Sequence, residues 1–154
     1  YVQHDLEMTL FFELIFGEET EFYQTLLNED LIDETFGYQF VLEPTYCFSI
    51  ITSATQYPDK LKEVLLSELN KYCGNLDDQE AFELLKKQFI GEFISSLNSP
   101  EYIANQYSKL YFEGVSVFDM LDIIDNITLD SINETATKFL NINNMVDSRL
   151  EPKA

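Results

Sequence analysis

Histidine, cysteine and glycine are scarce in this 154-residue sequence, which contains one, two and five of them, respectively. Because His4 is the only histidine, a Ser-His-Asp or Cys-His nucleophile system would depend on one residue near the N-terminus. Cys47 and Cys73 are too few for a disulfide framework or a cysteine-based zinc site, so we interpret both as ordinary buried or half-buried thiols. No glycine lies in a Gly-rich loop after a strand, which excludes a phosphate cradle.

Basic residues are also few, since nine Lys and Arg face 28 Asp and Glu, and the formal net charge is −19. Such a surface repels phosphate backbones and anionic lipids, so we expect no nucleic-acid partner. The acidity either attracts basic peptides or keeps an aromatic-rich protein soluble. No apolar run approaches the roughly 20 residues of a membrane span, and no signal-peptide pattern opens the chain. We therefore expect a cytoplasmic protein with no membrane span.

Aromatic residues are abundant, with 13 Phe and 9 Tyr, and this content argues against disorder. Residues 1–154 are sufficient for a single domain with its own core, and no low-complexity linker divides them. Helical periodicity dominates the chain and is interrupted by one stretch of period-two alternation. These patterns predict an α+β fold in which helices pack on one face of an antiparallel-rich sheet.

The stretch 6–38 joins two unlike helices to the start of the sheet. Residues 6–16 are apolar on nearly every side, which predicts a helix buried between layers, and Gly17 ends it. Thr20 can cap the next helix, whose first turn places Glu21 at the positive helix end. A strand is expected to follow from Phe36.

Alternating residues predict an antiparallel hairpin of two strands, 36–43 and 46–54, with Pro44 in the turn. We expect helices to cover its aromatic and aliphatic face. That face is predicted to consist of Phe36, Tyr38, Phe40, Phe48 and Ile50. The opposite face, with Gln39 and Ser49, is then free for another role.

Pro58 begins the next predicted helix, which Gly74 ends. Asp77 and Glu80 form a capping-box pattern for a long helix after it. We expect the apolar stripe of this long helix to bury against the aromatic face of the hairpin. The stripe consists of Phe82, Leu85, Phe89 and Phe93.

Three further helix starts are expected at Ser99-Pro100, Ser116 and Thr128. The first of these helices is predicted to bury one side, made of Ile103, Tyr107, Leu110 and Tyr111. Residues 144–151 alternate weakly, which predicts a strand that returns to the sheet.

The segment His4-Asp5-Leu6-Glu7-Met8 is one residue short of the H-x-x-E-H signature, in which two histidines hold zinc and the Glu activates water. Met8 occupies the place of the second histidine, and a thioether is a poor zinc ligand. We therefore interpret the segment as a helix start with one exposed histidine. We expect no catalytic residue and no metal ligand in this chain.

Several segments occur in a familiar order and spacing. They are Phe16–Leu27, Asp30–Asp33, Gln56–Leu61, Lys86–Gly91 and Ile124–Ile132. Together they resemble the second, non-catalytic domain of the pitrilysin/insulinase family of zinc metallopeptidases, which includes mitochondrial processing peptidase subunits. The sequence FGEETEFY is similar to the F-G-E-x-S-E-x-Y pattern of bacterial cytoplasmic processing-protease-like members.

The resemblance implies that residues 1–154 are the C-terminal, inactive half of a two-domain clamshell that encloses a polypeptide. Zinc and H-x-x-E-H would lie in a missing N-terminal domain, and the near-motif at His4 would be a remnant of internal duplication. Active members place an Arg and a Tyr in this domain, and the matching positions here are Leu27 and, with one deletion, Asp33. Losing such donors costs on the order of 10²-fold or more in rate.

The resemblance thus implies a substrate-enclosing domain with no activity of its own and no cofactor in this chain. Its substrate-facing candidates are Leu27, Asp33, Gln39 and Ser49. The implied partners are a peptide or polypeptide substrate and a homologous catalytic domain or subunit. An alternative is a pseudo-peptidase subunit for binding or assembly that pairs with a catalytic homologue. Whether the full-length protein is a zinc metalloendopeptidase depends on sequence outside this chain.

Overall fold

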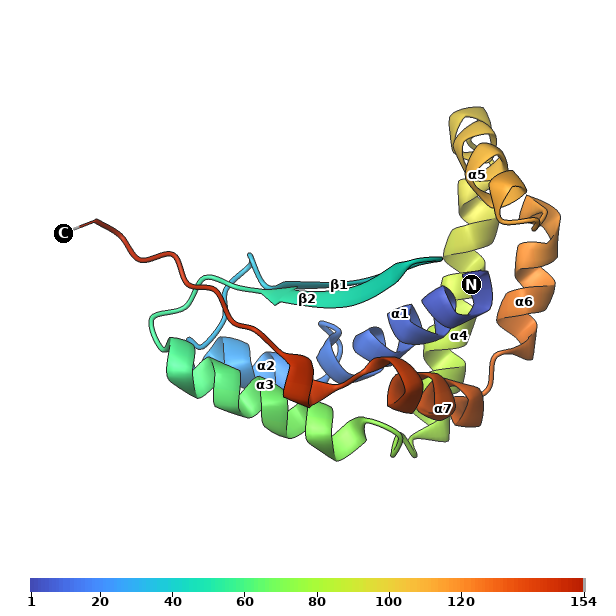
Figure 1. Ribbon diagram of the computed structural model, residues 1–154. Coiled ribbons are helices and arrows are strands. Elements are labelled where there is room, and N and C mark those ends of the chain that lie inside the picture. Colours follow the sequence, from blue (N-terminus) through green and yellow to red (C-terminus); the bar gives the residue numbers. More distant parts are fainter. Residues whose placement is uncertain (154) are drawn as a thin grey trace.

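Helix α1 (Val2–Phe16) lies at the centre of the computed structural model, which describes residues 1–153 (Figure 1). It contacts the first strand and helices from the rest of the chain. Phe11, Phe12 and Phe16 are at most 1% exposed. The prediction of a helix buried between layers is confirmed, because apolar side chains on nearly all sides of α1 each find a neighbour.

Within residues 1–153, six further helices follow α1. They are α2 (Glu21–Asn28), α3 (Pro58–Tyr72), α4 (Gln79–Ser96), α5 (Pro100–Phe112), α6 (Met120–Asn126) and α7 (Leu129–Phe139). Two short 3-10 turns, η1 (Val117–Asp119) and η2 (Ile142–Asn144), complete the helical part. Over the described residues, the sheet consists of β1 (Gly37–Glu43) and β2 (Tyr46–Thr52). The α+β class is confirmed, with helices on one face of an antiparallel sheet.

Side-chain caps fix where several helices begin, as the sequence predicts. The backbone N–H of Tyr23 donates to Thr20 Oγ1 over 3.1 Å, and that of Ser131 donates to Thr128 Oγ1 over 3.1 Å. The prediction for α4 is wrong by one residue, because Asp78 rather than Asp77 accepts the N–H of Ala81, at 2.9 Å. Asp78 is the residue immediately before the helix, so its carboxylate reaches the third N–H.

The hairpin forms, but its faces differ from the prediction. The turn holds only two residues, so Glu43 pairs with Tyr46, Val41 with Phe48, and Phe40 with Ser49. Directly paired residues share a face, which places Phe48 and Ile50 on the side opposite Tyr38 and Phe40. The inner face, which contributes Tyr38, Phe40 and Ile51, packs against the α1 core. The outer face carries Gln39, Val41, Tyr46, Phe48 and Ile50.

Helix α4 packs against α1 and α6, not against the hairpin as predicted. Phe82 and Phe93 are buried at 1% and 8% exposure, whereas Phe89 is only half-buried. It packs against the α1 core on one side and against a smaller apolar cluster around Phe93 on the other. The reason is that α1 occupies the inner face of the hairpin. The stripe on α4 therefore meets α1 instead of the strands.

Helix α5 projects from the body beyond the end of α4 (Figure 1). Leu110 is buried, but Tyr107 and Tyr111 are 52% and 66% exposed, so the predicted buried side is wrong for both tyrosines. Their rings stack on each other with centroids 6.1 Å apart. A projecting helix has few neighbours, and only a narrow stripe of it reaches the core.

The predicted C-terminal strand does not form, and residues 145–151 run in an extended path beside α3. Lys62 Nζ of α3 lies 2.6 Å from Asp147 Oδ1, and Arg149 Nη2 lies 2.8 Å from Asp59 Oδ1. Ion pairs with a helix therefore hold the tail where a sheet ladder was expected. Across residues 1–153, no helix is long and apolar enough to cross a membrane.

Candidate functional site

A buried polar cluster lies between α1 and α7, at the segment His4–Met8 that is one residue short of the H-x-x-E-H signature. Glu7 is 1% exposed and Thr135 is 3% exposed. Thr135 Oγ1 donates to Glu7 Oε2 over 2.5 Å, and Gln3 Nε2 donates to Glu7 Oε1 over 2.9 Å. His4 Nδ1 lies 3.0 Å from Glu7 Oε2 and 3.1 Å from Thr135 Oγ1. The Glu7 carboxylate is thus enclosed by donors from two helices.

The protonation of this cluster follows from its hydrogen bonds. The single Thr135 hydroxyl proton goes to Glu7, so Thr135 Oγ1 can only accept from His4. The His4 ring therefore carries its proton on Nδ1. Burial alone raises the pKa of Glu7, but the hydrogen bonds from Thr135, Gln3 and His4 outweigh it and hold that pKa below its ordinary value. Glu7 is an ionised carboxylate with its lone pairs engaged.

The cluster does not fit a zinc ion. Met8 is fully buried in the apolar core, where it packs with Phe11 and Phe12. Glu7 faces Thr135 rather than a space that could hold water, and His4 offers one imidazole. Among residues 1–153, no three His, Cys, Asp or Glu side chains converge in a way that could hold a metal. We interpret the cluster as a polar contact that joins α7 to α1.

The four substrate-facing candidates do not form one site. Leu27 is 38% exposed on α2, and Asp33 lies in the loop before β1, where its Oδ1 accepts from the backbone N–H of Thr35 at 2.8 Å. Hydrogen bonds from Thr35 lower the pKa of Asp33. Gln39 lies on the outer face of the hairpin, and Ser49 on the inner face opposite Phe40, so the prediction that they share a face is wrong. Both are exposed.

An exposed apolar surface on the hairpin was missed in the sequence. The outer face displays Tyr46, Phe48 and Ile50, which are 54%, 44% and 47% exposed. The rings of Tyr46 and Phe48 stack, with centroids 6.0 Å apart and planes 11° from parallel. Counting back from a two-residue turn would have paired Phe48 with Val41 and Ile50 with Gln39, and so would have placed them on the face away from Tyr38 and Phe40. We call this surface, defined by Gln39, Val41, Tyr46, Phe48 and Ile50, the outer hairpin face.

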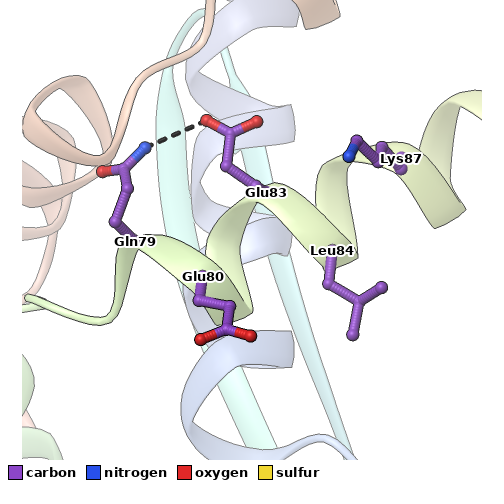
Figure 2. A pocket seen from close by; sticks show the side chains of 5 residues that line it. All are labelled: Gln79, Glu80, Glu83, Leu84 and Lys87. Carbon is purple, nitrogen blue, oxygen red and sulfur yellow. Dashed lines mark hydrogen bonds between the residues drawn. The ribbon is translucent and has the colours of Figure 1, made fainter.

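A shallow hollow on α4 offers no enclosed site. Figure 2 shows its lining, which comes from a single helix. The residues are Gln79, Glu80, Glu83, Leu84 and Lys87. Gln79 Nε2 donates to Glu83 Oε1 over 3.0 Å, and Leu84 is 70% exposed. The side chains do not converge on a point where a substrate atom could be held.

Comparisons with known proteins identify several proteins that are similar to this chain. No family model matches. The chain is 35% identical over 153 residues to the uncharacterized zinc protease YmfH of Bacillus subtilis (strain 168), a match that covers 99% of this chain and 36% of YmfH. A crystal structure from Alicyclobacillus acidocaldarius, described as that of an M16-like peptidase, superposes with a TM-score of 0.81 at 26% identity. The chain is thus similar to proteins described as a zinc protease and as an M16-like peptidase.

The extent of each match shows what part of these relatives the chain represents. It spans about a third of the first two relatives, since the match covers 36% of YmfH and 33% of the Alicyclobacillus chain, and 89% of this chain is covered in the latter. A crystal structure described as a zinc protease from Bordetella pertussis Tohama I has the same fold, with a TM-score of 0.73 at 16% identity, over 98% of this chain and 86% of that one. The resemblance to the pitrilysin/insulinase metallopeptidases is confirmed. The chain corresponds to about a third of YmfH and of the Alicyclobacillus peptidase.

Proposed function

We propose that the chain is the non-catalytic half of a two-domain zinc protease, and that it encloses a peptide cleaved by zinc held elsewhere in that protein. One observation carries this proposal. The α1 position that resembles the zinc motif is filled by a closed hydrogen-bond cluster, in which Glu7 bonds to Thr135 and Met8 is in the core. Helix α1 thus has a packing role here, whereas YmfH, of which this chain covers 36%, is named as a zinc protease.

The cofactor, partners and location follow from the same proposal. Zinc belongs to a part of the protein outside this chain, and the partners are a peptide substrate and a homologous catalytic domain. The packing of Tyr38, Phe40 and Ile51 on the inner hairpin face against the α1 core supports this arrangement, because it leaves the outer hairpin face to meet the enclosed peptide. Both thiols are free, and Cys47 is exposed rather than buried or half-buried as predicted. A free, exposed thiol agrees with a reducing cytoplasm.

The decisive experiment uses the full polypeptide that the gene encodes. We expect it to hydrolyse an internally quenched peptide, to lose this activity with a chelator, and to regain it with zinc. Glu7→Gln should retain the activity at temperatures where the variant stays folded. If Glu7→Gln abolishes hydrolysis without changing the unfolding midpoint, Glu7 is the catalytic base and the proposal is wrong. A polypeptide that is inert alone but active in complex with a catalytic homologue is instead the pairing subunit.

A further inference from the structure

The outer hairpin face is a contiguous apolar surface, not a set of scattered exposed residues. Tyr46 and Phe48 stack along β2, Ile50 continues the row, and Val41 lies beside Phe48 on β1. Single exposed apolar residues are ordinary on a protein surface, but rows of them mark interaction sites. Helices cover the inner face only, so the structure itself supplies no reason for apolar residues on this side.

The end of this surface at the hairpin turn is negatively charged. Glu43 ends β1 next to Tyr46, and the turn points toward the region where α1 begins and α5 projects (Figure 1). Burial raises the pKa of Asp5 of α1, Lys109 and the N-terminal amine lower it, and Glu113 and Glu43 raise it. These groups are close enough to interact electrostatically, and the three carboxylates outnumber the two ammonium groups by one. The charge favours a cation beside the apolar row.

We infer that the outer hairpin face binds an extended peptide through its apolar side chains, with a Lys or Arg of that peptide beside Glu43 at the turn. The inference rests on the proposed function, since it names the chemistry of the enclosed peptide. An extended peptide presents alternate side chains to one face, which matches a row of Tyr46, Phe48 and Ile50 on one strand. The net charge of −19 further favours a basic ligand.

The test measures binding with hydrolysis switched off. The full polypeptide, held in chelator, is titrated against a labelled ten-residue peptide with apolar residues at alternate positions and a Lys-Arg pair at one end. Fluorescence anisotropy follows the dissociation constant. Phe48→Thr should weaken binding by at least fivefold, because it removes the central ring of the row. Leu84→Gln, which removes an even more exposed apolar side chain from α4, should change the dissociation constant by less than twofold.

The charge is tested with a second pair of variants. Glu43→Gln should weaken binding of the basic peptide about two- to fivefold, the range of one exposed ion pair. It should not affect a peptide with Gln in place of Lys-Arg, and Glu80→Gln on α4 should affect neither. Binding that is insensitive to Phe48→Thr overturns the inference. So does a Phe48→Thr effect confined to self-association in sedimentation, which would make this face an interface between copies.

A third outcome would show that the rest of the polypeptide buries the outer hairpin face. If Phe48→Thr lowers the unfolding midpoint as much as Phe82→Ala does, the face is buried inside the full protein and the inference is wrong. The proposed function is tested separately, because hydrolysis with zinc can persist while the docking variants have no effect. Conversely, docking in chelator can be seen in a protein that cleaves nothing.

Discussion

The hydrogen bond between Thr135 and Glu7 should be among the most stabilising polar contacts of the protein. Thr135→Val keeps the shape of the side chain but removes the hydroxyl that donates to a carboxylate 1% exposed. Hydrogen bonds to buried charged groups are worth about 1.5 to 3 kcal/mol, so the variant should lose that much free energy of unfolding at pH 7. This is a large share of a total of roughly 5 to 15 kcal/mol.

A matched control lies two residues further along α7. Thr137 is exposed, and its Oγ1 donates to the carbonyl of Asn133 in its own helix over 2.9 Å. Thr137→Val makes the same chemical change on the same helix and should cost about 0.5 kcal/mol or less. Urea denaturation followed by circular dichroism gives both values from one protocol.

A double-mutant cycle isolates the contact itself. Glu7→Gln, Thr135→Val and the double variant should give a coupling energy of about 1 to 2 kcal/mol, since each single change breaks the same charge-assisted bond. The reasoning fails if Thr135→Val is no more destabilising than Thr137→Val, or if the two sites prove additive. In that event the hydrogen bond from Thr135 Oγ1 to Glu7 Oε2 contributes no stability, and apolar packing alone joins α7 to α1.

Three further predictions concern the core, pH and the site. Phe82→Ala should cost about 3 to 5 kcal/mol in urea denaturation, and Leu84→Ala about 0.5 or less, because the two side chains are 1% and 70% exposed. The pKa of Glu7 is lowered from 4.5 by folding, so the contribution of its ionised form to the free energy of unfolding is complete above about pH 4.5 and is lost as the pH falls through the folded-state pKa. Glu7→Gln should therefore flatten the decline of the unfolding midpoint at acid pH, and an unchanged decline would contradict this prediction. Leu27→Arg with Asp33→Tyr should give this chain no hydrolysis of a fluorogenic peptide above a mock-purified control, because donors without a metal-activated water have no nucleophile to assist.

Local chemistry in the sequence determined the limits of most elements. Thr20 and Thr128 cap the helices for which they were predicted, and Gly17 ends the central one. The apolar composition of residues 6–16 also predicted burial between layers correctly. These features depend on neighbours within about four residues along the chain, and the sequence displays such neighbours directly.

Longer-range contacts decided what the sequence could not. Thr135 is 128 positions from Glu7, and nothing near either residue indicates that they meet, so the carboxylate next to His4 had no predicted partner. Whether α4 packs on the hairpin or on α1 likewise depends on which helix occupies the inner face of the hairpin. The faces of the hairpin depend on its register, and one residue of slip moves Phe48 and Ile50 to the other side. Such choices depend on the free energy of packing whole elements together, because the same apolar stripe can bury equally well against a strand or a helix.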